Sequence, residues 1–125
     1  MSANALVAAV LIGQAAFSMA IEPQTGRTDD VAFSELADGQ AAAAIAKLEE
    51  SRRVDRDDPA TLINLGTAYA RMGMTEKALR AYTDAIDSDE RYELELANGE
   101  WMDSRDAALR ARDRLLQAKV IASRR

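Results

Sequence analysis

Residues 60–90 carry the pattern that most restricts how this 125-residue chain can fold. Apolar and small residues recur there at helical spacing, over positions 62–69 and again over positions 78–85. The pattern consists of Leu62, Leu65, Gly66, Tyr69, Gly73, Ala78, Tyr82 and Ala85. Residues at i, i+3, i+4 and i+7 share one face of an α-helix, and a glycine just after such a run commonly ends the helix. The spacing therefore predicts two amphipathic helices separated by a turn at Gly73.

The residue sizes in this pattern predict how the two helices pack. Gly66 has no side chain, so a neighbouring helix can approach it closely. In the second helix we expect Ala78 to give the close contact and Tyr82 to fill the gap beside Ala78. Tyr69 and Tyr82 both lie on the apolar faces and are therefore expected in the core. Thr75 is of a residue type that caps helix N-termini, and we expect it to cap the second helix.

This combination of a Leu-Gly pair, two aromatic residues, a turn glycine and an alanine resembles the tetratricopeptide repeat. Two positions depart from the family's usual pattern: Leu62 stands where tryptophan is common, and Glu90 stands where proline is common. The resemblance implies stacked helix-turn-helix units. It also implies a protein or peptide partner that binds on the concave surface formed by the first helix of each unit.

A weaker copy of the pattern occurs one tetratricopeptide period earlier in the chain. Shifting back by this period places Gly39, Ala44, Ile45, Leu48 and Val31 at the positions of Gly73, Ala78, Leu79, Tyr82 and Leu65. A forward shift gives no such match. We therefore expect two repeats, over about 30–57 and 59–90, and the helices of the first over about 30–38 and 40–53. The open alternative is two ordinary amphipathic helix pairs outside the family.

Residues 92–102 change the pattern from helical to alternating. Apolar residues alternate with acidic ones over 92–96, and Asn98-Gly99 follows before Trp101. Alternation beside an Asn-Gly pair is typical of a β-hairpin with a two-residue turn. We therefore predict a hairpin that pairs Leu96 with Trp101 and places the apolar side chains of its first strand on one face. The open alternative is a degenerate helix that ends at the glycine.

A last amphipathic helix is expected over 104–120, with Asp103 or Ser104 as its N-cap. Its apolar face consists of Ala108, Ala111, Leu115 and Ala118. Each unit of a repeat array leaves one face for a neighbour, so we expect this helix to cap the open end of the second repeat, and residues 121–125 to fray. The predicted fold class is mainly α, with two tetratricopeptide-like helix-turn-helix repeats, a short β-hairpin and a C-terminal capping helix.

The first 21 residues contain no charged side chain, and positions 5–20 read ALVAAVLIGQAAFSMA. Such an apolar run is typical of a secretory signal peptide, and the small residues Ser18 and Ala20 fit cleavage after Ala20. We therefore expect 1–20 to be a signal peptide, 21–29 to be a linker, and the mature protein to be periplasmic or otherwise exported. Two alternatives stay open because no basic residue precedes the run. The segment forms an uncleaved membrane anchor, or it forms a buried core helix.

The composition excludes several kinds of chemistry. The chain has neither cysteine nor histidine, so disulfides, thiolate nucleophiles, imidazole bases and nearly all zinc sites are excluded. The net charge of −5 argues against nucleic-acid binding. Asp55, Asp57 and Asp58 cluster before Pro59, but they lack the glycine and the distant glutamate of a calcium loop. We interpret them as helix capping and solvation, and we expect no catalysis, cofactor or metal.

The candidate binding residues follow from the tetratricopeptide resemblance. The apolar face of the helix at 59–71 turns to the core, so its other faces are expected to form the concave surface. The resemblance implies that Asn64 contacts a bound peptide, and a shift of one repeat period relates Thr67 to Phe33. The candidates are Phe33, Ile63, Asn64, Thr67 and Arg71. A plain solvated helix face is the open alternative. The expected function is a protein-binding scaffold; the alternative is a self-associating, homo-oligomeric or membrane-anchored structural protein.

Overall fold

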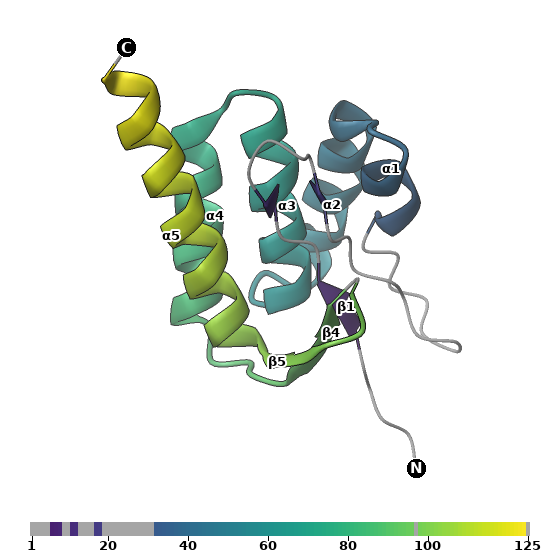
Figure 1. Cartoon of the computed structure of the whole chain (residues 1–125). Coiled ribbons are helices and arrows are strands. Elements are labelled where there is room, and N and C mark those ends of the chain that lie inside the picture. Colours follow the sequence, from purple (N-terminus) through teal and green to yellow (C-terminus); the bar gives the residue numbers. More distant parts are fainter. Residues whose placement is uncertain (1–5, 9–10, 13–16, 19–31, 97, 125) are drawn as a thin grey trace.

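The computed structural model describes residues 6–8, 11–12, 17–18, 32–96 and 98–124 (Figure 1). Within this part the helices are α1 (Phe33–Ala37), α2 (Ala41–Val54), α3 (Pro59–Arg71), α4 (Thr75–Asp87) and α5 (Ser104–Ser123). They follow one another across the molecule, and each helix contacts the next from α1 to α5, with the strand pair between α4 and α5 in the chain. The prediction of a mainly helical chain with a small antiparallel hairpin is confirmed.

The contact between α3 and α4 depends on the missing side chain of Gly66. A Cβ atom placed on this glycine would lie 2.5 Å from Cε1 of Tyr82 and 2.6 Å from Cδ1. The tyrosine ring therefore occupies the space that a side chain at position 66 would need. Tyr82 and Tyr69 are both buried, at 1% and 7% exposure, so the predicted core positions and the predicted close approach are confirmed.

The turn between α1 and α2 has the same backbone geometry as the turn between α3 and α4. Gly39 has φ +76° and Gly73 has φ +75°, so both adopt the left-handed conformation. In the first turn, Gln40 N donates to Glu35 O at 2.7 Å. In the second, at the equivalent positions, Met74 N donates to Tyr69 O at 2.9 Å. Both turns therefore end a helix with the same backbone hydrogen bond, from an N–H group to the carbonyl oxygen five residues earlier, which is typical of a glycine C-cap.

Two details of the helix starts differ from the prediction. Thr75 is the first residue of α4, and its N-cap position is Met74, which makes no side-chain capping bond. The first helix begins at Phe33 and not at about residue 30, because Ala32 has φ +59° and lies outside the helix. A left-handed residue cannot continue a right-handed helix. The helix α1 is therefore only 5 residues long.

The hairpin consists of β4 (Glu93–Leu96) and β5 (Trp101–Asp103), with a register that differs from the prediction by one residue. Trp101 pairs with Glu95 and not with Leu96. Leu96 N donates to Glu100 O at 2.7 Å. The loop between these two paired residues therefore contains three residues, whereas the prediction was a two-residue turn. Gly99 has φ +88°. A three-residue hairpin loop ends with a residue in this conformation, and this loop type accounts for the shift.

The C-terminal helix α5 packs against α4 and also contacts α3, as predicted for a capping helix. Asp103 is its N-cap and accepts hydrogen bonds from Arg105 N and Asp106 N. The predicted apolar face is correct only for the first half of the helix, because Ala108 and Ala111 are buried but Ala118 is exposed. The helix also continues to Ser123, so the expected fraying from residue 121 is wrong for 121–123.

Short strands form the described parts of the N-terminal segment. They are β1 (Leu6–Ala8), β2 (Leu11–Ile12) and β3 (Phe17–Ser18). β1 runs parallel to β4 and makes a sheet of order β1-β4-β5, while β2 pairs with β3. These parts are therefore strands and not the alternative core helix. The cleavage position after Ala20 and the linker 21–29 lie outside the described residues. Within the described part, no helix has the length and apolar character needed to cross a membrane.

Candidate binding surfaces

The predicted binding face of α3 is buried. Ile63, Asn64 and Thr67 are all at 0% exposure, so the prediction that they form an open surface is wrong. The reason is the central position of α3, which contacts α2, α4 and α5 and also the strand β1. Thr67 Oγ1 lies 3.1 Å from Ile63 O and 3.0 Å from the hydroxyl oxygen of Tyr82. The Thr67 side chain therefore belongs to the contact between α3 and α4.

Arg71 lies at the C-terminal end of α3 and is partly buried. Its Nη1 donates to the backbone oxygen of Leu36 at 2.6 Å, which ties α3 to α1. Burial lowers the pKa of Arg71 below its ordinary value. Its Nε and Nη2 atoms are buried and have no hydrogen-bond partner in the structure as described. The side chain of Phe33, the remaining candidate, lies outside the described side chains.

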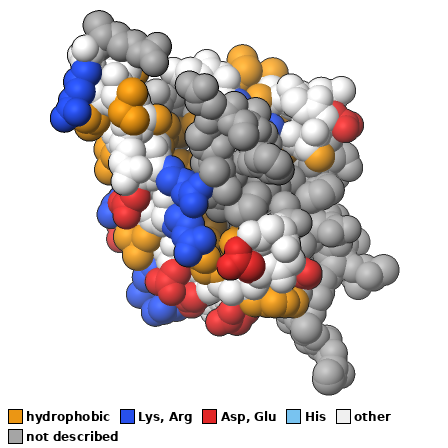
Figure 2. Space-filling model, viewed as in Figure 1, with side chains coloured by type: hydrophobic (Ala, Val, Ile, Leu, Met, Phe, Trp, Pro, Cys, Tyr) orange, Lys and Arg blue, Asp and Glu red, His pale blue; other side chains and the backbone are white. Residues whose placement is uncertain are grey.

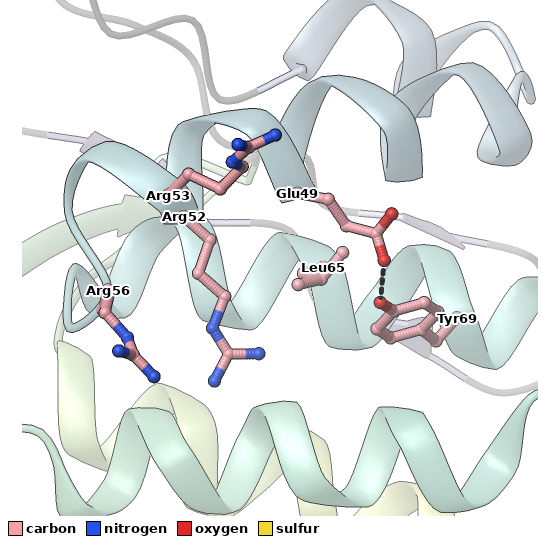
Figure 3. A pocket seen from close by; sticks show the side chains of 6 residues that line it. All are labelled: Glu49, Arg52, Arg53, Arg56, Leu65 and Tyr69. Atoms are coloured by element: carbon pink, nitrogen blue, oxygen red, sulfur yellow. Dashed lines mark hydrogen bonds between the residues drawn. The ribbon is translucent and has the colours of Figure 1, made fainter.

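An open hollow of about 500 Å³ lies between α2 and α3 (Figure 3). We call it the arginine hollow, and it is lined by Glu49, Arg52, Arg53, Arg56, Leu65 and Tyr69. Three of its four charged residues are arginines that come from the last turn of α2 and the residues just after it. Arg52 and Arg53 belong to α2, and Arg56 lies two residues after its end. These residues were not identified from the sequence, because nothing in a single helix shows that a tyrosine from another helix completes the hollow.

The charges of the arginine hollow are only partly neutralised. Arg52 Nη2 lies 2.5 Å from Asp84 Oδ2 on α4, and Arg53 Nη1 lies 3.5 Å from Glu50 Oε2. Arg56 forms no ion pair with any residue of the described part. Guanidinium groups in such a cluster can hold the carboxylates of a ligand through paired hydrogen bonds.

The acidic residue of the hollow is already engaged. The Tyr69 hydroxyl donates to Glu49 Oε2 at 2.6 Å. Burial, together with the hydrogen bond and negative charge of Glu49, raises the pKa of Tyr69 to about 12. The Lys77 ammonium lies 5.6 Å from the centroid of the Tyr69 ring. Glu49 is thus used to fix the tyrosine, and the arginines are the remaining charged groups of the hollow.

An acidic cluster lies at the start of α3. Carboxylate oxygens of Asp55, Asp58 and Glu90 all lie within 4.8 Å of one another. Asp58 accepts a hydrogen bond from Thr61 N at 3.1 Å, so its predicted role as a helix cap is confirmed. Asp58 also accepts a hydrogen bond from the Tyr92 hydroxyl. Sequence reasoning missed Glu90, because only the fold brings it beside residues that lie two helices earlier in the chain.

The acidic cluster changes the pKa of one of its own carboxyl groups, that of Glu90. Burial, followed by the hydrogen bond and charge of Asp55, raises the pKa of Glu90 to about 7. Nearby Asp58 and Asp57 contribute further negative charge. A carboxyl group that is partly buried beside other negative charges is harder to ionise. The arrangement is accounted for by capping and by hydrogen bonds within the chain.

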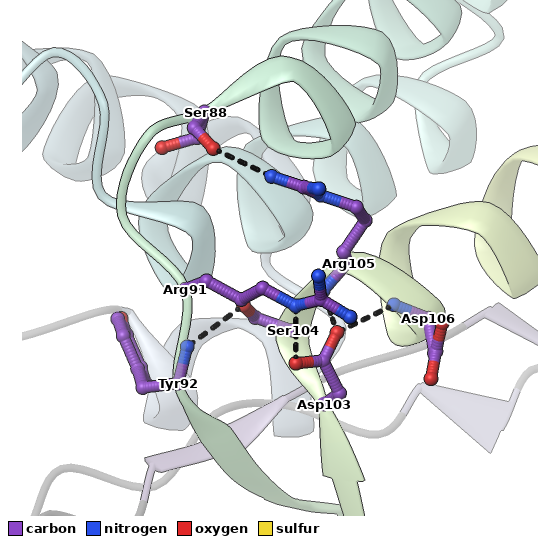
Figure 4. Close-up of polar contacts among 7 residues, drawn as sticks. All are labelled: Ser88, Arg91, Tyr92, Asp103, Ser104, Arg105 and Asp106. Carbon is purple, nitrogen blue, oxygen red and sulfur yellow. Dashed lines mark hydrogen bonds and ion pairs between the residues drawn. The ribbon is translucent and has the colours of Figure 1, made fainter.

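A second polar network joins the hairpin to α5 (Figure 4). Arg91 Nε donates to Asp103 Oδ2 at 2.7 Å, and Tyr92 N donates to Ser104 Oγ at 3.1 Å. Arg105 Nη2 donates to Ser88 O at 3.2 Å. Burial opposes ionisation of Asp103, but Arg91 and the backbone N–H groups of α5 lower its pKa below the ordinary value. These hydrogen bonds position the hairpin against α5, although the buried Nε of Arg105 has no hydrogen-bond partner in the described part of the chain.

Comparisons of this chain with protein-family models, with curated proteins and with solved structures found no match. The tetratricopeptide resemblance therefore rests on this chain's own residues and geometry.

Proposed function

We propose that this chain is a non-catalytic protein-binding module built from two helix pairs of the tetratricopeptide type. The support for the repeat is the pair of turns at Gly39 and Gly73, which share φ angles and backbone hydrogen bonds one repeat period apart. The fit of Tyr82 against Gly66 also supports it, because the repeat pattern requires close helix contact at that glycine. A fold alone does not define a function, so the binding role needs a site.

The observation that carries the binding role is the arginine hollow. It is open to solvent, holds three guanidinium groups and includes Arg56, which has no ion-pair partner in the described structure. Charged clusters of this kind favour ligands of opposite charge and accelerate their association. The partner is therefore a protein with an acidic segment.

The side chains available for catalysis support a binding role over an enzymatic one. The chain has no histidine and no cysteine. Burial raises the pKa of Tyr82 to about 12, and burial together with Glu49 does the same for Tyr69. A phenol that resists ionisation at neutral pH is a poor nucleophile and a poor base.

The test is charge reversal within the arginine hollow. Tagged protein with Arg53→Glu and Arg56→Glu is compared with a variant that carries Arg110→Glu and Arg124→Glu. These two arginines are exposed, one on α5 and one directly after it, and their replacement changes the net charge equally. Partners captured from envelope extracts of the native host should be lost only with the first variant. Capture should also weaken when salt is raised, because exposed charges are screened. Equal capture by both variants would place the partner elsewhere.

Export is part of the proposal, since residues 1–20 have the composition of a signal peptide. The alternative is retention of residues 5–20 as an anchor. Protein purified from the native host should begin at Ile21 and appear in the soluble envelope fraction. An intact Met1 on soluble cytoplasmic protein would contradict export, and detergent-dependent extraction of the intact chain would favour the anchor.

Self-association is the second candidate function, and the outer end of α5 favours it. Leu116, Val120 and Ile121 are 40%, 49% and 59% exposed and line a shallow apolar hollow with Gln117. Figure 2 shows hydrophobic side chains along the outward side of this helix. Such a surface can bury itself against a second copy. Sedimentation should then show a dimer that Val120→Glu dissociates, while Arg53→Glu leaves it intact.

A further inference from the structure

The strand β4 is the central strand of its sheet, and one of its edges is covered by a segment distant in the chain. β5 pairs with β4 on one side, and β1 pairs with it in parallel on the other (Figure 1). The register places Leu6 opposite Leu94, Val7 opposite Glu95 and Ala8 opposite Leu96. Leu94 and Leu96 are at 0% and 1% exposure. Without β1, the backbone groups along this edge would lack their strand partner.

The same segment also covers the helices. β1 contacts α3, and β2 contacts α5. Three candidate contact residues of α3, namely Ile63, Asn64 and Thr67, are fully buried in this arrangement. The helix that was expected to hold a peptide is therefore contacted by an extended segment of the chain itself.

The amino-acid composition of this segment indicates which class of ligand the surface binds. Residues 5–12 read ALVAAVLI, and the first charged side chain is Glu22. An extended peptide that adds to a sheet edge gains affinity from main-chain hydrogen bonds and specificity from alternate side chains. The alternate positions of β1, Leu6 and Ala8, are aliphatic or small residues and pair with Leu94 and Leu96 in the backbone register.

We propose that β4 and the adjoining side of α3 form a second binding site, which takes an extended, uncharged apolar segment of a partner protein as a parallel strand. Residues 6–8 occupy this site within the chain, so that the site opens only when they are displaced or removed. The proposal does not depend on the arginine hollow, which lies between α2 and α3.

A disulfide lock tests the occupancy in the full chain, which has no cysteine of its own. In the variant Val7→Cys/Glu95→Cys, the two thiols replace side chains that are neighbours in the register. In the control Val7→Cys/Glu93→Cys, the offset of two residues puts the Cα atoms about 8 Å apart, beyond the reach of a disulfide. Mild oxidation should cross-link the first variant within one molecule and not the control. Equal cross-linking of both, or of neither, would overturn the proposal.

Ligand binding is then measured with a fluorescent peptide of residues 4–12 followed by two lysines for solubility. The reduced Val7→Cys/Glu95→Cys chain should bind this probe at least about tenfold more tightly than the oxidised chain, because a ligand strand must displace β1. A peptide with prolines in place of Val7 and Val10 should not bind, since proline cannot complete a strand ladder. Equal binding by the two redox states, equal binding of the proline peptide, or no binding by the reduced chain would overturn the proposal.

A change that abolishes binding at one of the two proposed sites should leave binding at the other intact. The Arg53→Glu and Arg56→Glu changes should leave binding of the apolar probe unchanged. The disulfide lock should leave capture through the arginine hollow unchanged.

Discussion

Gly66 and Tyr82 show how a single missing side chain sets the distance between two helices. The tyrosine ring lies where a Cβ on Gly66 would stand, and its hydroxyl is 3.0 Å from Thr67 Oγ1. The equivalent positions one repeat period earlier hold Ala32 and Leu48, both buried. A larger residue at the first position is therefore accompanied by a smaller one at the second.

Gly66→Ala should lower the free energy of unfolding by about 1–3 kcal/mol, because the added methyl group overpacks the core. Urea denaturation measures the loss. The double variant Gly66→Ala/Tyr82→Leu reproduces the residue pair of the first repeat, and its loss should be smaller than the sum of the two single losses. Strict additivity would mean that the two positions are not in contact.

Glu90 makes stability depend on pH near neutrality. Its pKa is about 7 in the folded chain against an ordinary value of 4.5, owing first to burial and then to Asp55. Between these two pH values the folded state binds more protons than the unfolded state, so stability falls as the pH rises. The stabilising contribution is complete below about 4.5 and is lost as the pH rises through about 7.

Glu90→Gln should remove this dependence and raise the urea midpoint at pH 8 relative to the wild type, with little change at pH 5. Glu76→Gln is the matched control. The hydrogen bond and charge of Lys119 lower the pKa of Glu76. Titration of Glu76 therefore affects stability only below the tested pH range. The same slope in the wild type and in Glu90→Gln between pH 5 and 8 would contradict the assignment.

At the scale of elements, the existence of the hairpin could be predicted from the sequence, but the register of its two strands could not. The alternation over 92–96 and the Asn-Gly pair indicated two strands with a tight turn. Two-residue and three-residue loops both use a glycine with positive φ, so the sequence alone did not distinguish them. The side chain of Asn98 accepts a hydrogen bond from Glu100 N at 2.9 Å and stabilises the longer loop.

Gly99→Val should destabilise this loop by about 1–2 kcal/mol, since φ at this position is +88° and a β-branched residue resists it. No neighbouring atom lies within 4 Å of a Cβ placed there, so the cost is purely conformational. Faster hydrogen exchange at the Leu96 amide would report the loss. Glu100→Val, at an exposed position without positive φ, should exchange more slowly than Gly99→Val.

Arg71 ties two helices together, which changes what its replacement should do. Its Nη1 donates to Leu36 O at 2.6 Å, so Arg71→Glu would place a carboxylate against a carbonyl oxygen. We expect a loss of about 1–2 kcal/mol in the free energy of unfolding, since a charged hydrogen bond is replaced by a repulsive contact. Arg80→Glu on the exposed side of α4 is the control. Equal stability of the two variants would mean that the contact contributes nothing.

At the scale of the whole molecule, the central place of α3 decides which surfaces are available. Every residue from Pro59 to Tyr69 is buried, although a helix at the surface would expose about half of its positions. The helices α2 and α4 pack on two sides of α3, and α5 and β1 also contact it. The polar residues Asn64 and Thr67 are therefore core residues, and the binding site that we propose is the arginine hollow instead.

The local elements of this protein could be predicted from its sequence. Helical spacing located α2, α3 and α4, the glycines at 39 and 73 located two equivalent turns, and alternation located the hairpin. These features depend on residues that are near one another in the chain, so one segment contains the whole signal. The close approach of a helix at Gly66 was also predicted, because this residue has no side chain, but the tyrosine that fills the space there was not identified.

Which faces are covered and which side chains meet could not be predicted, because both depend on how distant parts of the chain pack together. The contact of β1 with β4 joins the N-terminal segment to a strand that follows four of the helices. The approach of Glu90 to Asp55 joins positions on opposite sides of the α3–α4 helix pair in the chain. No periodicity within a helix records what packs on its outer face, because that depends on the remaining chain. The buried Asn64, the hidden edge of β4 and the arginine hollow all arise from such distant contacts.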